Sequence, residues 1–212
     1  MGNMKITFNM EYVADMNKYI LVLVSIALLS SPAYAKENIY KEMVTLKKQA
    51  EKGNTKSAIE YGERCLNIYW QMDMKGKYNC IARDGFLLIK KLADKGNADA
   101  QEVVGENLYL GHGQARNYSE SFNYLLKSAI QGNAKAAEWV ANYYAWIGVA
   151  VQPNPIKAYA WYSISYSQDD DGDNEMLKLN EKEFEMKLTS TQLIEAQQLA
   201  KKCQESNFQD CN

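Results

Sequence analysis

The 212-residue sequence has one histidine, three prolines and no marked excess of charge of either sign. Its 24 Lys and Arg residues are balanced by 26 Asp and Glu residues, which gives a formal net charge of −2. Binding to nucleic-acid phosphates needs a basic stripe, so we expect no nucleic-acid partner. The scarcity of proline and the many Ala, Leu, Lys, Glu and Gln residues favour a helical chain.

The sequence also lacks catalytic motifs. It contains no G-x-S-x-G, no H-E-x-x-H and no P-loop. The one histidine, His112, lies between two glycines, and nucleophilic catalysis with a histidine base would depend on it alone. We therefore predict no catalytic residues and no cofactor, and we expect His112 to be a solvated turn residue.

An acidic stretch at residues 169–175 is a candidate for a metal site. Asp169, Asp171 and Asp173 are spaced like the first three ligands of a calcium loop, but Asn174 and Asn180 stand where that loop needs Gly and Glu. The stretch is interpreted as a polar connection, and no metal is expected.

The longest apolar run, residues 19–29, is too short to cross a bilayer as a helix. Lys18 precedes it and small residues follow at 30–35, which is typical of a secretory signal cut after Ala35. A buried helix is the alternative. Glu11 and Asp15 are unusual in such a leader and leave Met16 as an alternative start. We predict export to the periplasm or medium, without stable membrane insertion after cleavage.

The four cysteines, Cys65, Cys80, Cys203 and Cys211, survive this cleavage, and an even number in an exported chain favours disulfides. Three connectivities are open. Pairing neighbours, Cys65 with Cys80 and Cys203 with Cys211, closes the shortest loops and is favoured. A metal pair at the first two cysteines is disfavoured, because metal knuckles have two to four intervening residues.

A short sequence motif ending in Gly-Asn occurs three times, with its glycine at residues 53, 96 and 132. Each copy lies between two segments with helical periodicity. Gly is favoured just beyond a helix end because it adopts the left-handed conformation without steric penalty. Each copy therefore predicts a helix end, a tight turn and a new helix. The helix pairs bury their apolar stripes only against one another, so we expect them to stack.

Further motifs resemble the Sel-one-like repeat (SLR), a relative of the tetratricopeptide repeat. They are Gly111-His112-Gly113, Gly148-Val149-Ala150-Val151, Lys157-Ala158 with Trp161-Tyr162, and the pairs Tyr61-Gly62 and Val104-Gly105. The third copy departs from the pattern with Ala141-Asn142. The resemblance implies an all-α, right-handed solenoid of antiparallel helix pairs.

The leader pattern and the resemblance together give the predicted organisation. A signal peptide at 1–35 is followed by an opening helix at 36–53, about three repeats at 54–168, and C-terminal capping helices with a disulfide tail at 169–212. In the closing helix, Thr189 and Gln192 are spaced as a capping box.

In function, the resemblance implies a non-catalytic protein that binds a protein or peptide on a concave surface lined by the first helices. Tyr and Trp are common anchors of interfaces. Tyr143 and Trp146 share one side of a regular helix and are the predicted anchors, with Glu106 and Asn107 as polar contacts. Two alternatives stay open: an immunity protein that neutralises a toxin, and a hydrolase of β-lactams or cell wall, as suggested for cysteine-rich relatives.

Overall fold

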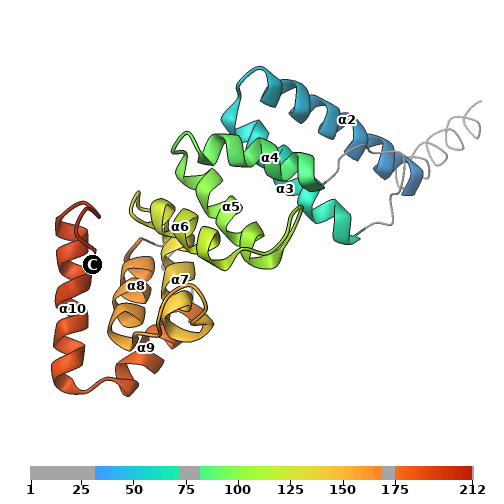
Figure 1. Cartoon of the computed structure of the whole chain (residues 1–212). Coiled ribbons are helices and arrows are strands. Elements are labelled where there is room, and N and C mark those ends of the chain that lie inside the picture. Colours follow the sequence, from blue (N-terminus) through green and yellow to red (C-terminus); the bar gives the residue numbers. More distant parts are fainter. Residues whose placement is uncertain (1–31, 72–81, 169–174, 212) are drawn as a thin grey trace, which may run out of the picture. The chain divides into compact units, whose positions relative to one another are not determined.

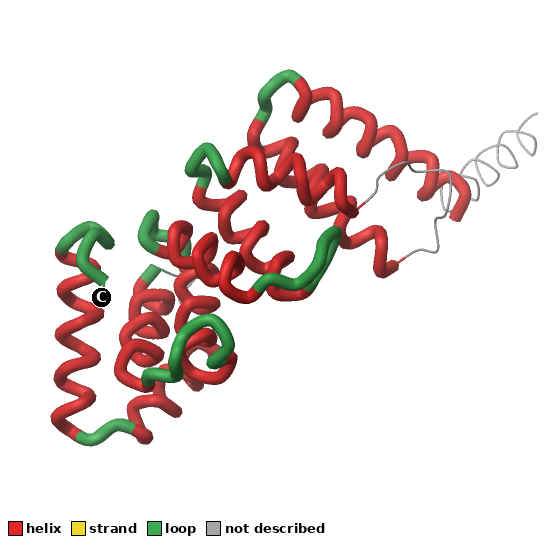
Figure 2. Tube along the Cα trace, viewed as in Figure 1, coloured by secondary structure: helices red, strands yellow, loops and turns green. Residues whose placement is uncertain are grey.

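A computed structural model of the chain describes residues 32–71, 82–168 and 175–211, and within these ranges every regular element is helical (Figures 1 and 2). Most of the predicted signal segment, Cys80 and Asp169–Asp173 lie outside the described residues. No described helix is long and apolar enough to cross a membrane.

The chain divides into two units, residues 1–48 and 49–212. Helix α2 (Pro32–Glu51) makes up the described part of the first unit and ends just inside the second. It begins before the predicted cleavage site and ends close to the predicted end of the opening helix. The remaining description concerns the second unit.

Three helix pairs follow one another along the second unit, and each helix packs on the next one in the sequence (Figure 1). The pairs are α3 (Thr55–Gln71) with α4 (Ala82–Ala93), α5 (Ala98–Leu110) with α6 (Tyr118–Ala129), and α7 (Ala134–Asn142), extended by the short π-helix η1 (Tyr143–Ile147), with α8 (Pro155–Ser167). This nearest-neighbour packing is the arrangement expected of a solenoid.

The three Gly-Asn turns have the predicted conformation. Gly53, Gly96 and Gly132 have φ values of 91°, 96° and 91°, in the region that only glycine adopts without strain. The asparagine after each glycine starts the next helix. For example, the Asn97 side chain accepts a hydrogen bond of 2.8 Å from the backbone N–H of Ala100. One dipeptide thus ends one helix and begins the next.

Successive helices approach closely at small residues. A Cβ atom on Gly105 of α5 would lie 2.5 Å from Cγ of Leu125, which is fully buried in α6, so only glycine fits there. Buried serines add hydrogen bonds between helices. Ser128 Oγ donates to the carbonyl of Ala98, and Ser165 Oγ donates to the carbonyl of Ala134, both at 2.8 Å.

The C-terminal helices α9 (Glu175–Lys187) and α10 (Ser190–Glu205) both pack on α8. The predicted capping box is present: the Thr189 N–H donates to Gln192 Oε1 at 3.0 Å, and the Gln192 N–H donates to Thr189 Oγ1 at 3.3 Å. A disulfide joins Cys203 of α10 to Cys211 of the tail. The pairing of Cys65 with Cys80 stays a prediction, because Cys80 lies outside the described residues.

Candidate functional site

The first helix of each pair contributes to one surface, which we call the first-helix face. It comprises exposed and partly exposed side chains of α3, α5, α7 and η1, with the buried Glu102 beneath them. Its charged residues interact across repeats: the pKa of Glu63 on α3 responds to Asp99 and Glu106 on α5 and to Lys135 on α7. The three repeats therefore share one electrostatic environment on this side.

Lys135 lies at the centre of this face. Its Nζ is 2.8 Å from Glu102 Oε1 and 2.8 Å from Glu106 Oε2, so it links α7 to α5. Burial raises the pKa of Glu102 to about 7, although the ion pair with Lys135 opposes the shift. Burial alone would lower the pKa of Lys135, but its two ion pairs outweigh burial and raise the pKa. Lys135 therefore stays charged near neutral pH and is a poor nucleophile.

Beside this cluster is a hollow of about 590 Å³, lined by Thr55, Lys56, Ile59, Glu60 and Glu63 of α3 and by Asp99 of α5. Partial burial raises the pKa of Glu63, and the neighbouring carboxylates of Glu106, Glu60 and Asp99 add to the shift. The hollow thus combines an apolar wall at Ile59 with three carboxylates.

The other end of the face is aromatic. Trp146 of η1 is 53% exposed, and its Nε1–H donates to the Tyr162 hydroxyl at 3.3 Å. The Phe184 ring packs against it at a centroid distance of 5.2 Å, and Lys187 Nζ lies 4.2 Å from the Trp146 ring centre. The indole is therefore held in place by α8 and α9 while about half of its surface is open to solvent.

Tyr143, the other predicted anchor, is fully buried, and that prediction is wrong. Its hydroxyl donates to the carbonyl of Tyr118 at 3.1 Å, its ring packs edge-on against Phe122, and burial raises its pKa to about 12. Tyr143 has α-helical dihedrals and continues the buried stripe of Ala136 and Val140 along α7. The π-helix follows it, and there the Gly148 N–H bonds to the carbonyl five residues earlier. The wider turn rotates Tyr143 and Trp146 away from a common side.

Of the two predicted polar contacts, Glu106 lies on the first-helix face and is bound to Lys135. Asn107 is 7% exposed, and its Nδ2 donates to the carbonyl of Val103 in its own helix at 2.7 Å. The prediction for Asn107 is therefore wrong. Sequence reasoning missed Glu102 and Lys135, although Asp99, Glu102 and Glu106 have the spacing that places side chains on one face of a helix.

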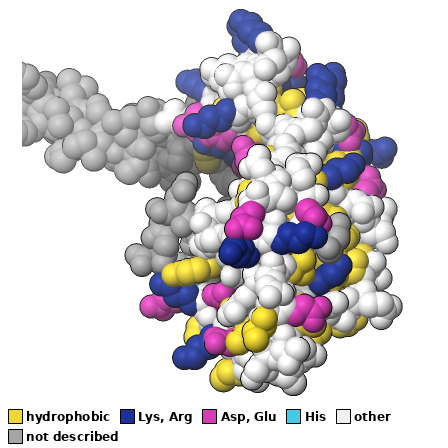
Figure 3. All heavy atoms as spheres, turned by 90° about the vertical axis from the view of Figure 1, so that its left-hand side faces the viewer, with side chains coloured by type: hydrophobic (Ala, Val, Ile, Leu, Met, Phe, Trp, Pro, Cys, Tyr) yellow, Lys and Arg dark blue, Asp and Glu magenta, His cyan; other side chains and the backbone are white. Residues whose placement is uncertain are grey.

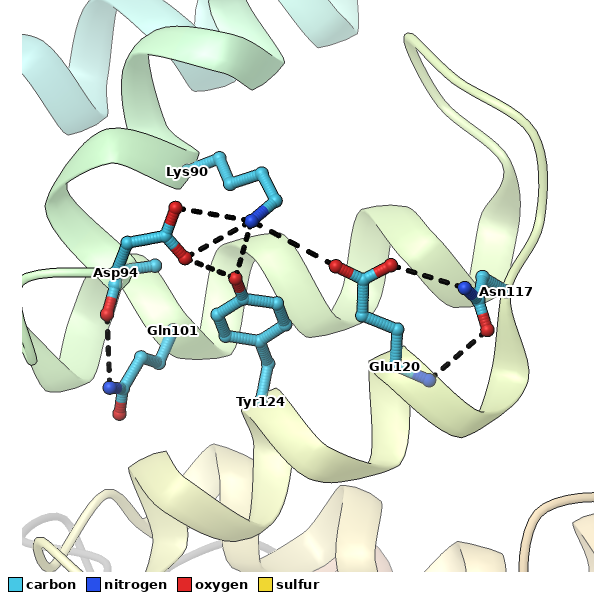
Figure 4. A network of polar contacts seen from close by, with 7 residues as sticks. Lys90, Asp94, Gln101, Asn117, Glu120 and Tyr124 are labelled. Atoms are coloured by element: carbon cyan, nitrogen blue, oxygen red, sulfur yellow. Dashed lines mark hydrogen bonds and ion pairs between the residues drawn. The ribbon is translucent and has the colours of Figure 1, made fainter.

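A second polar network joins the second helices α4 and α6 (Figure 4). Lys90 Nζ lies 2.6 Å from the Tyr124 hydroxyl, 3.1 Å from both carboxylate oxygens of Asp94 and 3.8 Å from Glu120 Oε1. The Tyr124 hydroxyl also donates to Asp94.

The pKa shifts in this network favour one protonation state for each of its members. Hydrogen bonding to Tyr124, and then to Asp94, raises the pKa of Lys90, while burial raises the pKa of Tyr124. The hydrogen bond from Tyr124 lowers the pKa of Asp94. Near neutral pH the lysine is charged and the tyrosine is neutral, so neither is an activated nucleophile. The geometry suits a brace between α4 and α6 rather than a reaction centre.

The remaining candidates do not form a site with these clusters. His112 lies in the turn between α5 and α6, beside Gly111, which has a positive φ and ends α5. Within the described ranges, no group of three or more His, Cys, Asp or Glu side chains is arranged to hold a metal ion. On the face of the molecule shown in Figure 3, Lys and Arg side chains are interspersed with Asp and Glu.

Packed helix pairs joined by glycine turns define an α-solenoid, and comparison with solved structures shows which kind. No family model matches the chain, and no curated protein matches it significantly. A protective antigen of uropathogenic Escherichia coli that displays an SLR fold matches with a TM-score of 0.65 and 24% identity over 78% of this chain. A Sel1 repeat protein from Oxalobacter formigenes matches with a TM-score of 0.51 and 22% identity over 68% of this chain.

These likenesses show that the chain has the SLR fold, as its motifs predicted. The match spans 98% of the Oxalobacter protein but only 34% of the Escherichia coli antigen, so the chain corresponds to about a third of the longer solenoid.

Proposed function

We propose that this chain is an exported, non-catalytic protein that binds a protein or peptide partner on its first-helix face. The observation that carries the proposal is the exposed indole of Trp146, held by Phe184 and Tyr162 in a fixed orientation. A large ring that is already ordered loses little side-chain freedom on binding, which is one reason that Trp is common among interface anchors.

Two features support the export part of the proposal. The first is the leader-like pattern of residues 1–35, and the second is the Cys203–Cys211 disulfide, a bond that persists mainly in oxidising compartments. The non-catalytic part is supported by the ion pairs and hydrogen bonds that hold Lys135 and Lys90 in the charged form, in which neither lysine is a nucleophile.

The test is to isolate the partner from the native cell envelope and titrate it with the wild-type protein and with Trp146→Ala. The substitution is expected to weaken binding by about 2 kcal/mol or more, roughly thirtyfold in Kd, because a central anchor is lost. Leu87→Ala is the matched control: Leu87 on α4 is 51% exposed but lies on a second helix, so this variant is expected to bind like wild type.

Circular dichroism of each variant checks that the fold is kept. Equal binding by wild type and a folded Trp146→Ala would contradict the assignment of the anchor. Hydrolysis of a β-lactam or murein fragment that disappears in His112→Ala would contradict the non-catalytic assignment and favour the hydrolase alternative.

A further inference from the structure

The hollow on the first-helix face has walls of two kinds. Ile59 of α3 provides apolar surface, and the carboxylates of Glu60, Glu63 and Asp99 outnumber the one cation in the lining, Lys56. A long cationic side chain has the same two parts, an apolar stem and a charged head, and such side chains bury the stem while the head stays with polar groups. The hollow therefore matches an arginine or lysine side chain in its chemistry.

The charge balance of this region is also incomplete. Among the described residues here, four carboxylates, of Glu60, Glu63, Asp99 and Glu106, together with Glu102, whose pKa is about 7, face three cations, of Lys56, Arg64 and Lys135. Arg64 is bound to Glu60 at 2.8 Å, and Lys135 is shared between Glu102 and Glu106.

Glu63 and Asp99 form no ion pair with any described residue, although Asp99 Oδ1 lies 3.5 Å from Asn133 Nδ2. Burial and the neighbouring carboxylates raise the pKa of Glu63, although the charge of Lys135 opposes the shift. A further cation between Glu63 and Asp99 would relieve the repulsion between these two side chains.

We propose that the first-helix face binds an extended segment of its partner that places an arginine or lysine side chain in the hollow and an apolar side chain on Trp146. This inference rests on the proposed function and adds the chemistry of the ligand. The stem of the basic residue packs on Ile59, and its head pairs with Glu63 and Asp99. An arginine head suits this arrangement well, because its fork of N–H groups can reach two carboxylates.

The distance along the face sets the length of the segment. Directly packed helices lie roughly 10 Å apart, so α3 and η1, on first helices two repeats apart, are separated by at least about 20 Å. An extended chain rises about 3.3 Å per residue, so about six residues separate the basic and the apolar side chains.

The proposal is tested with the full protein and three fluorescein-labelled ten-residue peptides, followed by fluorescence anisotropy. Each peptide has two leucines near one end and, about six residues away, two arginines, two citrullines or two glutamates. The arginine peptide is expected to bind with a Kd at least about tenfold lower than those of the other two peptides. Added salt is expected to reduce this ratio of Kd values, because it screens the ion pairs. Absence of binding by the arginine peptide, or equal binding of the citrulline or glutamate peptide, would overturn the proposal.

Variants of the hollow test whether its carboxylates cause the preference for the arginine peptide. Glu63→Gln, alone and combined with Asp99→Asn, is expected to remove most of the preference for arginine over citrulline. Glu195→Gln is the matched control, because it removes one exposed carboxylate from α10 and is expected to keep the preference. An unchanged preference in the Glu63 and Asp99 variants would overturn the assignment of the hollow.

Titration of the native partner with the same variants distinguishes a failure of the cationic-ligand proposal from a failure of the proposed binding function. If Trp146→Ala weakens binding of the native partner while the Glu63 and Asp99 variants bind it like wild type, the binding function stands and the cationic ligand is wrong. If Trp146→Ala also binds the native partner like wild type, the site of the proposed function is wrong as well.

Discussion

Glu102 shows how a single residue can make the stability of the fold depend on pH. It is only 6% exposed, it is paired with Lys135 across a repeat boundary, and it lies beside Glu106. Burial nevertheless raises its pKa from an ordinary value near 4.5 to about 7. The folded protein thus keeps a proton on this carboxyl group at pH values at which the unfolded chain has lost it.

The sign of the effect follows from this difference in bound protons. As pH rises from about 4.5 to about 7, the unfolded state binds fewer protons at this position than the folded state, so Glu102 makes the free energy of unfolding fall. Glu102→Gln is expected to reduce this fall by roughly 2–3 kcal/mol, which corresponds to the size of the pKa shift. Urea denaturation of both proteins at pH 4.5, 6 and 8 measures the difference.

Glu195→Gln provides the control for this experiment, because it removes an exposed glutamate of α10 instead of a buried one. It is expected to follow the wild-type curve. A Glu102→Gln curve parallel to wild type would show that another group, such as Glu63, sets the pH dependence.

At the scale of elements, the Gly-Asn turn is the unit from which the solenoid is built. The glycine ends one helix in the left-handed conformation, and the asparagine caps the next helix through its side-chain oxygen. Because the same chemistry recurs at residues 53, 96 and 132, each repeat begins in the same way. The start of each of the three helix pairs is therefore set by residues of the local turn.

The cap can be tested at Asn97, whose Oδ1 is 2.8 Å from the Ala100 nitrogen. Asn97→Ala is expected to lower the free energy of unfolding by about 1 kcal/mol, because it leaves a helix N–H without its side-chain acceptor. Asn97→Asp keeps an acceptor and places a negative charge at a helix N-terminus, so it is expected to stay close to wild type. Urea midpoints distinguish the two variants, and equal losses in both would show that the amide group matters for another reason.

Some of these elements could be predicted from the sequence and others could not. The Gly-Asn turns, the helix pairs and the Thr189–Gln192 capping box were predictable, because each depends on residues close together in the chain. The π-helix at Tyr143–Ile147 was not, since its single wider turn has no marked sequence signal and breaks the period of 3.6 residues. The π-helix changes the direction of Trp146 relative to Tyr143, whereas Tyr143 itself continues the buried stripe of Ala136 and Val140.

Contacts between repeats could not be predicted from the sequence either. The Glu102–Lys135 ion pair joins α5 to α7, so its two residues are far apart in the sequence and no local pattern indicates that they meet. The spacing of the acidic residues along α5 predicts only that their carboxylates lie on one side of the helix. Asn107 shows the reverse case: a polar side chain expected at the surface is buried, because its own helix satisfies its amide.

At the scale of the whole molecule, stability in a stack of repeats is approximately a sum of terms between neighbours, so an end of the stack is held less firmly than its middle. Helix α10 packs on α8 at the C-terminal end of the described chain. The Cys203–Cys211 disulfide fastens the tail to this helix, and both sulfurs are buried, with residue exposures of 0% and 4%. A bond at this position opposes fraying where fraying is easiest.

Replacing both cysteines, Cys203→Ala with Cys211→Ala, is therefore expected to cost about 2–3 kcal/mol, as for a short closed loop, and to act locally. Hydrogen exchange is expected to accelerate at least about tenfold in α10, while amides of α5 and α6 keep their wild-type protection, because only neighbouring helices lose packing energy. Ile194→Ala, which truncates an exposed side chain of α10, is expected to leave exchange unchanged. An equal acceleration in α5 and α10 would instead mean that residues 49–212 open as one cooperative unit, and that the disulfide stabilises the whole stack by opposing its global unfolding.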